Sequence, residues 1–382
     1  MPEPAFPLGP GATIGLLGGG QLGRMTAMAA ARLGFRTHVF TPERDSPAAQ
    51  VSASATVAAW SDEAALDAFA AAVDAVTLEF ENVPAQALER MARRVPVAPS
   101  PDVLRICQDR IAEKTFLATA GVATGAWAPA AAPGDVAGAV AAVGLPCVLK
   151  TTRLGYDGKG QAILCREDDL APALARLAGA DGRFRPLIAE AFVDFACEVS
   201  VLVARDRTGL VAAYDTVENR HRDHILDLSI APARVAPGVA MAAEAAARRV
   251  AEAFGLVGLI CVEFFVTRDG RVLANEIAPR PHNSGHWTIE ACAVSQFEQL
   301  VRATAGLPLG DPARHADALM HNLLGEAVAA MPRLLATPGL IPHHYGKAEA
   351  RPGRKMGHVT RLYPRGGLPG EQEIATAFAP AL

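Results

Sequence analysis

Cys-Val-Glu-Phe-Phe-Val at residues 261–266 and Val-Leu-Ala-Asn-Glu-Ile at residues 272–277 flank the segment Thr-Arg-Asp-Gly-Arg. Both flanking runs are apolar, and Asp-Gly is the preferred centre of a two-residue hairpin turn because both positions need positive φ. The stretch therefore predicts an antiparallel hairpin with Asp269 and Gly270 at its tip. In that register Glu263 lies directly opposite Glu276 on one face of the sheet.

Two directly opposed carboxylates repel each other, because their Cβ atoms lie only about 5 Å apart. Neither glutamate has a Lys or Arg beside it in its own strand, so a hard divalent cation such as Mg²⁺ is the simplest remedy. A solvated pair on an exposed face, or one protonated carboxyl group, is the alternative. The polar loop Ala278–His286 follows directly and favours a binding site, because loops at strand ends concentrate binding groups.

The composition limits the classes of protein to which this chain can belong. Its 382 residues suffice for two or three domains, and 51% hydrophobic with 20% charged residues is typical of a well-buried globular protein. A net charge of −4 and a pI near 6.2 give no electrostatic footprint for nucleic acid. We expect no membrane span, because no stretch reaches ~20 apolar residues, and no signal peptide, because the first basic residue is Arg24. Six cysteines without metal-site spacing predict a reducing cytoplasm and no zinc.

Up to residue 98 the sequence alternates strand and helix patterns, which predicts one doubly wound α/β domain. Gly18–Gly23 matches G-x-G-x-x-G, but the second strand lacks the terminal acidic residue that holds a dinucleotide ribose. A phosphate-bearing substrate at the helix N-terminus is therefore favoured over NAD. Gln21 lies at the mouth of this loop. Glu79 and Glu81 end a later strand and face the same crevice, although ordinary solvation of a strand end is the alternative for Glu81.

A second glycine-rich segment, Thr151–Gln161, follows a strand that ends at Lys150. Its backbone N–H groups can close over phosphates while lysines supply point charges. It is not a Walker A loop, because it joins two strands and lacks G-x-x-x-x-G-K-[ST]; a mobile hairpin turn is the alternative. Further on, Ala191–Val193 can offer backbone groups to a purine edge and Glu198 can hold ribose hydroxyls. Short strands and turns rich in Pro and Gly, at 317–382, predict a small C-terminal β domain.

Four motifs together carry a resemblance to a known family. They are Gly-Gly-Gln-Leu-Gly-Arg at 19–24, the loop 155–161 after Lys150, the Asn275-Glu276 strand with Pro279–Trp287, and Arg-Pro-Gly-Arg-Lys-Met-Gly-His at 351–358. With them the chain resembles the N5-carboxyaminoimidazole ribonucleotide synthetases, which are ATP-grasp carboxylases of purine biosynthesis. The resemblance begins near Thr13 and implies a mixed α/β and α+β ATP-grasp architecture. It implies a doubly wound parallel-sheet domain at 1–108, an ATP-grasp domain at 109–310 with a glycine-rich lid at about 120–189, and a small β domain at 311–382.

The same resemblance implies the functional residues. Those around ATP would be Arg110, Lys150, Gly155, Tyr156, Asp157, Gly158, Lys159, Gly160, Gln161, Glu190, Ala191, Phe192, Val193, Glu198, His221, Asn275 and Glu276. Those around 5-aminoimidazole ribonucleotide would be Gln21, Glu79, Tyr156, Asp157, Lys347 and Arg354, with the last two on its phosphate. Lys150, Arg280 and His282 would be catalytic, the latter two at the bicarbonate and carboxyphosphate site, and Glu263 and Glu276 would hold Mg²⁺.

The activity that the resemblance implies is ATP-dependent carboxylation of 5-aminoimidazole ribonucleotide by bicarbonate, through carboxyphosphate, in a cytoplasmic homodimer. Three alternatives stay open at this point. A formate-dependent ribonucleotide transformylase or another ATP-grasp ligase would share Lys150 and both glutamates. An NAD-dependent dehydrogenase rests on the glycine loop alone, and a non-catalytic module predicts ATP binding without turnover. The lead into the second glycine loop and His224 both depart from the family's usual pattern, which leaves the role of Arg153 open.

Overall fold

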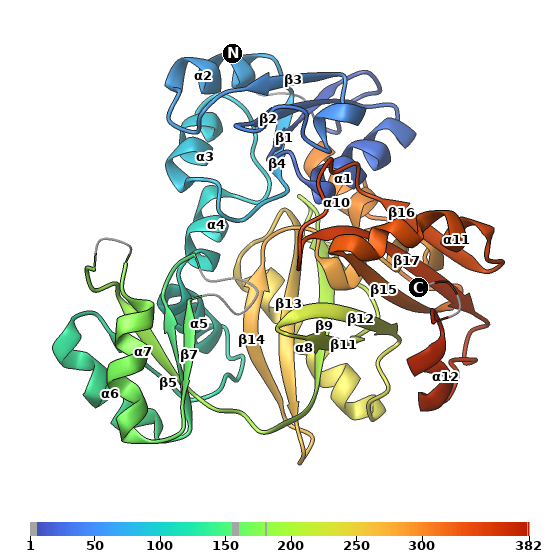
Figure 1. Cartoon of the computed structure of the whole chain (residues 1–382). Helices are drawn as coiled ribbons and strands as arrows, with labels where there is room; N and C mark the ends of the chain where they lie inside the picture. The colour runs from blue at the N-terminus through green and yellow to red at the C-terminus, as the bar shows by residue number, and fades with distance from the viewer. Residues whose placement is uncertain (1–5, 155–159, 180–181, 380, 382) are drawn as a thin grey trace.

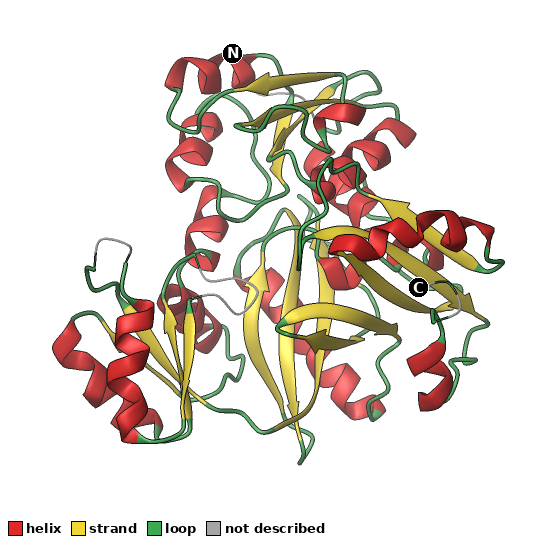
Figure 2. Ribbon diagram, viewed as in Figure 1, coloured by secondary structure: helices red, strands yellow, loops and turns green. Residues whose placement is uncertain are grey.

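The computed structural model describes residues 6–154, 160–179, 182–379 and 381, which form three sheets and the helices that cover them (Figure 1, Figure 2). One sheet belongs to the N-terminal part and one to the lid. The third runs through the middle of the molecule into the C-terminal part. Within these described ranges, every helix is too short or too polar to cross a membrane.

The N-terminal sheet has four parallel strands and carries the first glycine loop. Its order is β3-β2-β1-β4, from Thr13–Leu17 (β1), Arg36–Thr41 (β2), Ser54–Val57 (β3) and Ala75–Leu78 (β4), with helices Gln21–Arg32 (α1), Glu63–Ala71 (α2) and Ala85–Ala92 (α3). Residues of α2 and α3 share a hydrophobic cluster with Leu17, whereas residues of α1 share another with Ile14. These two β1 side chains point to opposite faces, so helices cover both sides of the sheet. This confirms the predicted doubly wound domain.

The lid is an antiparallel sheet of four strands in the order β5-β8-β6-β7. The strands are Trp127–Ala130 (β5), Cys147–Thr151 (β6), Gln161–Leu164 (β7) and Leu187–Ala191 (β8), and helices Val136–Val143 (α6) and Leu170–Leu177 (α7) pack on them. Figure 1 shows the lid as a lobe of its own beside β14. Helices Pro101–Cys107 (α4) and Arg110–Thr119 (α5) lead into it from the N-terminal part.

The central sheet has nine strands, eight of them in the order β14-β13-β9-β11-β12-β15-β17-β16. They are Phe195–Arg205 (β9), Val211–Ala213 (β10, which pairs with β9), Val217–Arg222 (β11), Ile225–Ala231 (β12), Gly258–Thr267 (β13), Val272–Ala278 (β14), Asp317–Leu324 (β15), Leu340–His344 (β16) and Lys355–Tyr363 (β17). Helices Pro237–Ala253 (α8), Thr288–Ala291 (α9), Gln296–Ala305 (α10), Met331–Ala336 (α11) and Glu371–Thr376 (α12) pack on it. Because β15 pairs with β12, the C-terminal strands continue this sheet instead of forming a separate one.

The β13–β14 hairpin reaches the predicted pairing by an unpredicted route. The prediction of a two-residue turn is wrong. The Thr267 N–H donates to the Arg271 carbonyl and Val266 pairs with Val272, so the loop between the strands has three residues. Within this loop only Gly270 takes a positive φ, of 82°. This shifts the ladder by one residue near the tip. A bulge at Asn275 then shifts it back, so Glu263 does pair with Glu276. The two irregularities compensate each other, and the opposed glutamates are confirmed.

Candidate active site

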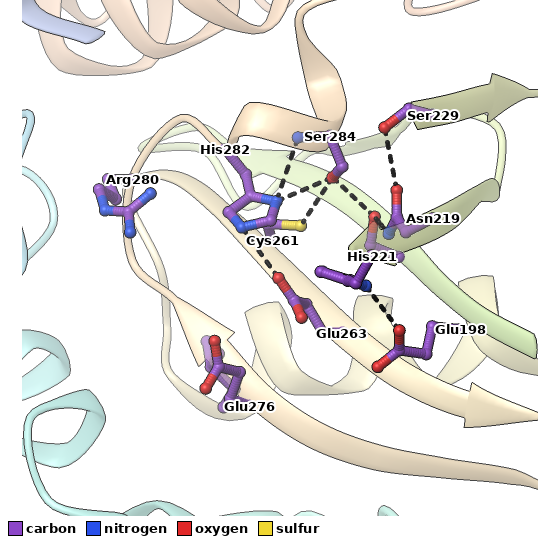
Figure 3. Close-up of polar contacts among 12 residues, drawn as sticks. Glu198, Asn219, His221, Ser229, Cys261, Glu263, Glu276, Arg280, His282 and Ser284 are labelled. Carbon is purple, nitrogen blue, oxygen red and sulfur yellow. Dashed lines mark hydrogen bonds and ion pairs between the residues drawn. The ribbon is translucent and has the colours of Figure 1, made fainter. Parts of the chain in front are cut away.

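The opposed glutamates lie on the same side of the hairpin, below the loop that carries Arg280 and His282 (Figure 3). Each already contacts a basic group: Glu263 Oε1 lies 2.9 Å from His282 Nε2, and Glu276 Oε2 lies 3.5 Å from Arg110 Nη1. Burial lowers the pKa of His282, but Cys261 and Glu263 outweigh it and raise the pKa to about 10. For Glu263 the directions are reversed: burial raises the pKa, but the contact with His282 outweighs burial and holds the pKa below its ordinary value. The protein thus offsets the repulsion itself, and the pairing alone does not require a metal.

The donor atoms at the hairpin nevertheless fit a hard cation. Besides the two carboxylates, Asn275 Oδ1 is buried and has no hydrogen-bond partner in the described part of the chain. Asn275 is the bulged residue directly before Glu276. Carboxylate and amide oxygens are ligands that Mg²⁺ takes readily in proteins. The expected metal ligands are therefore in one place, with a further oxygen beside them.

A pocket between the lid and the central sheet brings together five of the expected nucleotide residues. A cavity of about 80 Å³ is lined by Lys150, Glu190 and Ala191–Val193, and an adjoining cavity of about 430 Å³ shares Ala191–Val193. Glu190 Oε2 lies 3.1 Å from Lys150 Nζ and 3.5 Å from Lys114 Nζ. Two ammonium groups therefore share one carboxylate, which leaves a positive charge in the pocket that suits a polyphosphate.

Glu198 and His221 meet on neighbouring strands of the central sheet. His221 Nδ1 lies 2.6 Å from Glu198 Oε2, at a point where the β11–β12 register shifts. Burial lowers the pKa of His221, but Glu198 outweighs it and raises the pKa above its ordinary value. Figure 3 shows this pair on the same side of the sheet as Glu263. Two residues that the sequence analysis expected around ATP therefore contact each other as an ion pair.

The first glycine loop holds a protein carboxylate. Glu79 accepts hydrogen bonds from the N–H groups of Gly20, at 2.8 Å, and Gly23, at 3.3 Å. A Cβ on Gly18 would lie 2.6 Å from Glu79 Oε1, so the glycine is needed for this close approach. The carboxyl group at the α1 N-terminus is thus that of Glu79, whose pKa burial raises above its ordinary value, and the phosphate expected there is not what the loop is built around. Gln21 opens α1 beside it, partly buried.

Glu81 anchors Arg280 across the boundary between the N-terminal part and the central sheet. The guanidinium makes a two-pronged contact with the carboxylate: Nε donates to Oε2, and Nη2 donates to Oε1 at 2.8 Å. Burial raises the pKa of Glu81, but Arg280 outweighs it and lowers the pKa to about 2. Of the two readings left open for Glu81, the contact favours a functional one, because it orients a residue expected at the bicarbonate site.

Lys347 and Arg354 lie in the loop between β16 and β17. Lys347 Nζ donates to the Lys355 carbonyl at 2.7 Å, and Arg354 Nη1 donates to the Glu349 carbonyl at 2.8 Å. Burial lowers the pKa of Lys347 to about 8, with a smaller contribution from Arg354, while Glu79 acts in the opposite direction. The C-terminal loop is therefore within electrostatic reach of the N-terminal carboxylate expected at the same substrate.

Part of the expected site lies outside the described residues, namely Gly155, Tyr156, Asp157, Gly158 and Lys159. Their neighbours are described. Gly160 accepts a hydrogen bond from Thr151, and Gln161 opens β7 opposite Lys150. The segment therefore does connect two antiparallel strands, as predicted.

Comparisons with known proteins agree along the whole chain. Family models match as a ribonucleotide synthetase preATP-grasp domain at 11–108, an ATP-grasp domain at 115–297 and a phosphoribosylaminoimidazole carboxylase C-terminal domain at 318–365. The N5-carboxyaminoimidazole ribonucleotide synthase of Brucella melitensis is 49% identical over 94% of this chain and 98% of its own length; that of Bacillus subtilis is 41% identical over 92% and 91%. The chain belongs to the N5-carboxyaminoimidazole ribonucleotide synthase family.

A solved member of the N5-carboxyaminoimidazole ribonucleotide synthase family bears directly on the site. The crystal structure of the Aspergillus clavatus enzyme in complex with ADP and 5-aminoimidazole ribonucleotide matches with a TM-score of 0.87 and 33% identity. The match covers 97% of this chain and 97% of that one. The ATP-grasp architecture predicted from the motifs is confirmed.

Two residues at the candidate active site were missed in the sequence. Lys114 Nζ donates to the Asn275 carbonyl at 2.8 Å, and Glu113 accepts from the Ile277 N–H at 2.6 Å. Both therefore complete the outer edge of β14 on either side of Glu276. The available signal was spacing, because residues three and four positions after Arg110 share its face of a helix.

A second polar cluster lies between α9 and the C-terminal strands. Glu290, His343 and His358 bring possible ligand atoms within 4.8 Å of one another. However, the two imidazole rings stack with centroids 4.4 Å apart and planes 9° apart, so one ion cannot lie in the plane of both. Glu290 Oε1 instead lies 2.6 Å from His343 Nε2. The cluster is therefore best described as a Glu–His pair stacked on a buried histidine.

Proposed function

We propose that this protein carboxylates 5-aminoimidazole ribonucleotide with bicarbonate and ATP to give N5-carboxyaminoimidazole ribonucleotide, ADP and phosphate, in de novo purine biosynthesis. Membership of the family supports the reaction. The observation that carries it in the structure is the meeting of the Glu263–Glu276 pair with Arg280 and His282, on a hairpin whose Ala274 also lines the nucleotide pocket. An acidic pair suits a metal-bound triphosphate, and a cationic pair suits bicarbonate and carboxyphosphate.

The chemistry needs positioning and charge neutralisation more than a covalent intermediate on the protein. A bicarbonate oxygen attacks the γ-phosphorus of ATP, and the bond to the ADP oxygen breaks. The exocyclic amine then attacks the carboxyl carbon of carboxyphosphate, or of the CO₂ that it releases; phosphate leaves and the amine loses a proton. Mg²⁺, held by Glu263 and Glu276, would neutralise negative charge on the phosphates. Arg280, fixed by Glu81, and His282, whose raised pKa keeps it protonated, would bind the anionic carboxyl donor.

The remaining residues fall into two groups in this proposal. Lys150, Arg110 and His221 face the phosphates, while Glu190, Ala191–Val193 and Glu198 hold the nucleoside. Lys347 and Arg354 bind the ribonucleotide phosphate, and Gln21, Glu79, Tyr156 and Asp157 bind the rest of that substrate. A cytoplasmic homodimer completes the proposal; the scattered, free cysteines support the reducing compartment.

A coupled assay of ADP release tests the reaction. The expected result is ADP formation that needs both the ribonucleotide and bicarbonate, with formate unable to replace bicarbonate. ADP formation that ignores the ribonucleotide, or that runs on formate, would contradict the proposal. Binding of ATP without any turnover would point instead to a non-catalytic module.

The pKa of Lys347 predicts how ribonucleotide binding depends on pH. A lysine with a pKa of about 8 in the free enzyme is largely protonated at pH 7 and largely neutral at pH 9. Only the ammonium form attracts the substrate phosphate, which is already a dianion above pH 7 because its second pKa is about 6. Affinity for the ribonucleotide should therefore fall as pH rises through 8, by up to about tenfold per pH unit.

Titration calorimetry between pH 7 and 9.5 measures this dependence, with Lys347→Arg as the matched variant. The guanidinium stays charged throughout, so the variant should show a flat profile over the same range. An equally steep fall in both proteins would assign the titration to another group.

A further inference from the structure

Gln296, the first residue of α10, holds one residue of the proposed active site by its backbone. Its Oε1 accepts from the His282 N–H at 2.8 Å, and its Nε2 donates to the His282 carbonyl at 2.8 Å. The same Nε2 lies 3.1 Å from His286 Nδ1. Gln296 is fully buried, and its amide is satisfied on both atoms. The side chain thus pairs with His282 as a neighbouring β-strand would.

The held residue has an orientation that matters for the proposed reaction. His282 Nδ1 lies 2.8 Å from Ser284 Oγ, and its Nε2 lies 2.9 Å from Glu263 Oε1 (Figure 3). Both ring nitrogens of His282 therefore have a partner. The ring can contact Ser284 and Glu263 at the same time only if the backbone of His282 stays in place. Among the described residues, the Gln296 carboxamide contacts both backbone polar groups of His282.

Gly285 provides a second, independent observation. A Cβ at this position would lie 2.8 Å from Gln296 Oε1 and 2.5 Å from Leu202 Cδ1. Contacts that short force a shift of the neighbours, so any side chain here would displace the carboxamide from His282. The glycine in His-Asn-Ser-Gly-His thus leaves the space that the Gln296 carboxamide occupies when it contacts the backbone of His282.

We propose that Gln296 is a positioning residue for the carboxylation reaction: its buried carboxamide clamps the backbone of His282 and so holds the imidazole against Glu263 and Ser284, beside the proposed bicarbonate site. This inference rests on the proposed function for its kinetic part. It assigns to Gln296 no contact with substrate, and it predicts a defect specific to the carboxyl donor.

The chain offers a matched control on the same helix. Gln299 is also fully buried, and its amide makes the same two-sided clamp on another backbone residue: Nε2 donates to the Gly310 carbonyl at 2.7 Å, and the Gly310 N–H donates to Oε1 at 2.9 Å. Gly310 lies in the connector after α10, outside the proposed site. Gln296→Met and Gln299→Met therefore each remove a two-sided contact with one backbone residue from a fully buried position, and Gln296→Met also removes the contact with His286.

Steady-state kinetics on the full-length enzyme separate the two variants. Gln296→Met should lower kcat/KM for bicarbonate about 10- to 100-fold, as is usual when a residue that orients a functional group is lost. The dissociation constant for ATP should stay within about twofold. Gln299→Met should lose a similar amount of thermal stability but keep the wild-type kinetic constants. Gly285→Ala should reproduce the bicarbonate defect.

A double-mutant cycle distinguishes positioning from general disruption. In a His282→Ala background, Gln296→Met should cost less than about threefold further, because the ring that it aims is gone. The full cost in that background, or equal kinetic defects in Gln296→Met and Gln299→Met, would overturn the inference.

A spectroscopic test is independent of turnover. In histidine-labelled protein, the His282 ring ¹⁵N signals, assigned by their loss in His282→Ala, should shift in Gln296→Met and not in Gln299→Met. Unchanged signals in Gln296→Met would contradict the clamp. If the wild type shows no bicarbonate-dependent ADP release, the proposed function fails, while this measurement still decides the clamp.

Discussion

Glu276→Gln should reduce ADP formation by about 10²- to 10³-fold, the factor expected when metal stabilisation worth several kcal/mol is lost. The amide keeps the shape of the side chain but removes the charge that faces the expected metal. Glu276 is the sharper choice of the opposed pair, because its contact with Arg110, at 3.5 Å, is longer than the contact of Glu263 with the proposed catalytic residue His282, at 2.9 Å. Calorimetry gives a readout apart from turnover: Mg²⁺ should strengthen ADP binding to the wild type and should leave ADP binding to the variant nearly unchanged.

Glu244→Gln serves as the control for a lost carboxylate. Glu244 pairs with Arg248 on α8, away from the hairpin's acidic face. This variant should keep both the wild-type rate and the Mg²⁺ effect on ADP binding. A Glu276→Gln enzyme that regains full activity at high Mg²⁺ concentration and still shows the Mg²⁺ effect on ADP would remove Glu276 from the metal site.

Arg280→Met should lower kcat/KM for bicarbonate by about 10²- to 10³-fold, because a charged donor at the carboxyl donor's site is lost. It should also destabilise the fold by on the order of 3 kcal/mol, because Glu81 would be left mostly buried without its partner. Glu81→Gln in the same background separates the two effects. The double variant should recover stability, since neither charge remains, yet stay as inactive as Arg280→Met.

The stability difference between wild type and Arg280→Met should depend on pH. Arg280 lowers the pKa of Glu81 from 4.5 to about 2 in the folded protein. A lowered carboxyl pKa stabilises the fold above the unfolded-state pKa, and the gain is lost as pH falls through the folded-state value. Urea unfolding should therefore show the full difference at neutral pH and a shrinking one between pH 4.5 and 2. A difference that stays constant down to pH 2 would show that the lost stability comes from packing.

The sequence allowed the acidic pair to be predicted because it is local. Both glutamates belong to one hairpin, and strand pairing places residues that are close in sequence. The turn type could not be predicted in the same way: Asp-Gly suits both a two-residue turn and a three-residue loop with glycine last, and the Asn275 bulge has no signal of its own. The predicted pairing of Glu263 with Glu276 was right because the three-residue loop and the bulge shift the strand register by one residue in opposite directions.

The contacts that tune the site lie beyond such local reasoning. Glu81 and Arg280 are 199 positions apart, and which carboxylate meets which guanidinium depends on how the N-terminal part sits on the central sheet. Strand order did place Glu79 in the crevice of the glycine loop, but its hydrogen bond from the Gly20 N–H, which makes an apparent phosphate loop an internal carboxyl site, has no signal in the sequence. A glycine motif indicates that another group approaches the backbone closely, but only the fold shows which group that is.

The ladder from β14 through β12 to β16 is unbroken, so the hairpin with the acidic pair and the β16–β17 loop with Lys347 belong to one continuous plate. The proposed metal ligands and the proposed anchor for the ribonucleotide phosphate are consequently carried by one sheet. The lid, in contrast, has a sheet of its own. Ending the chain before β15 would bare the outer edge of β12 and invite self-association along it.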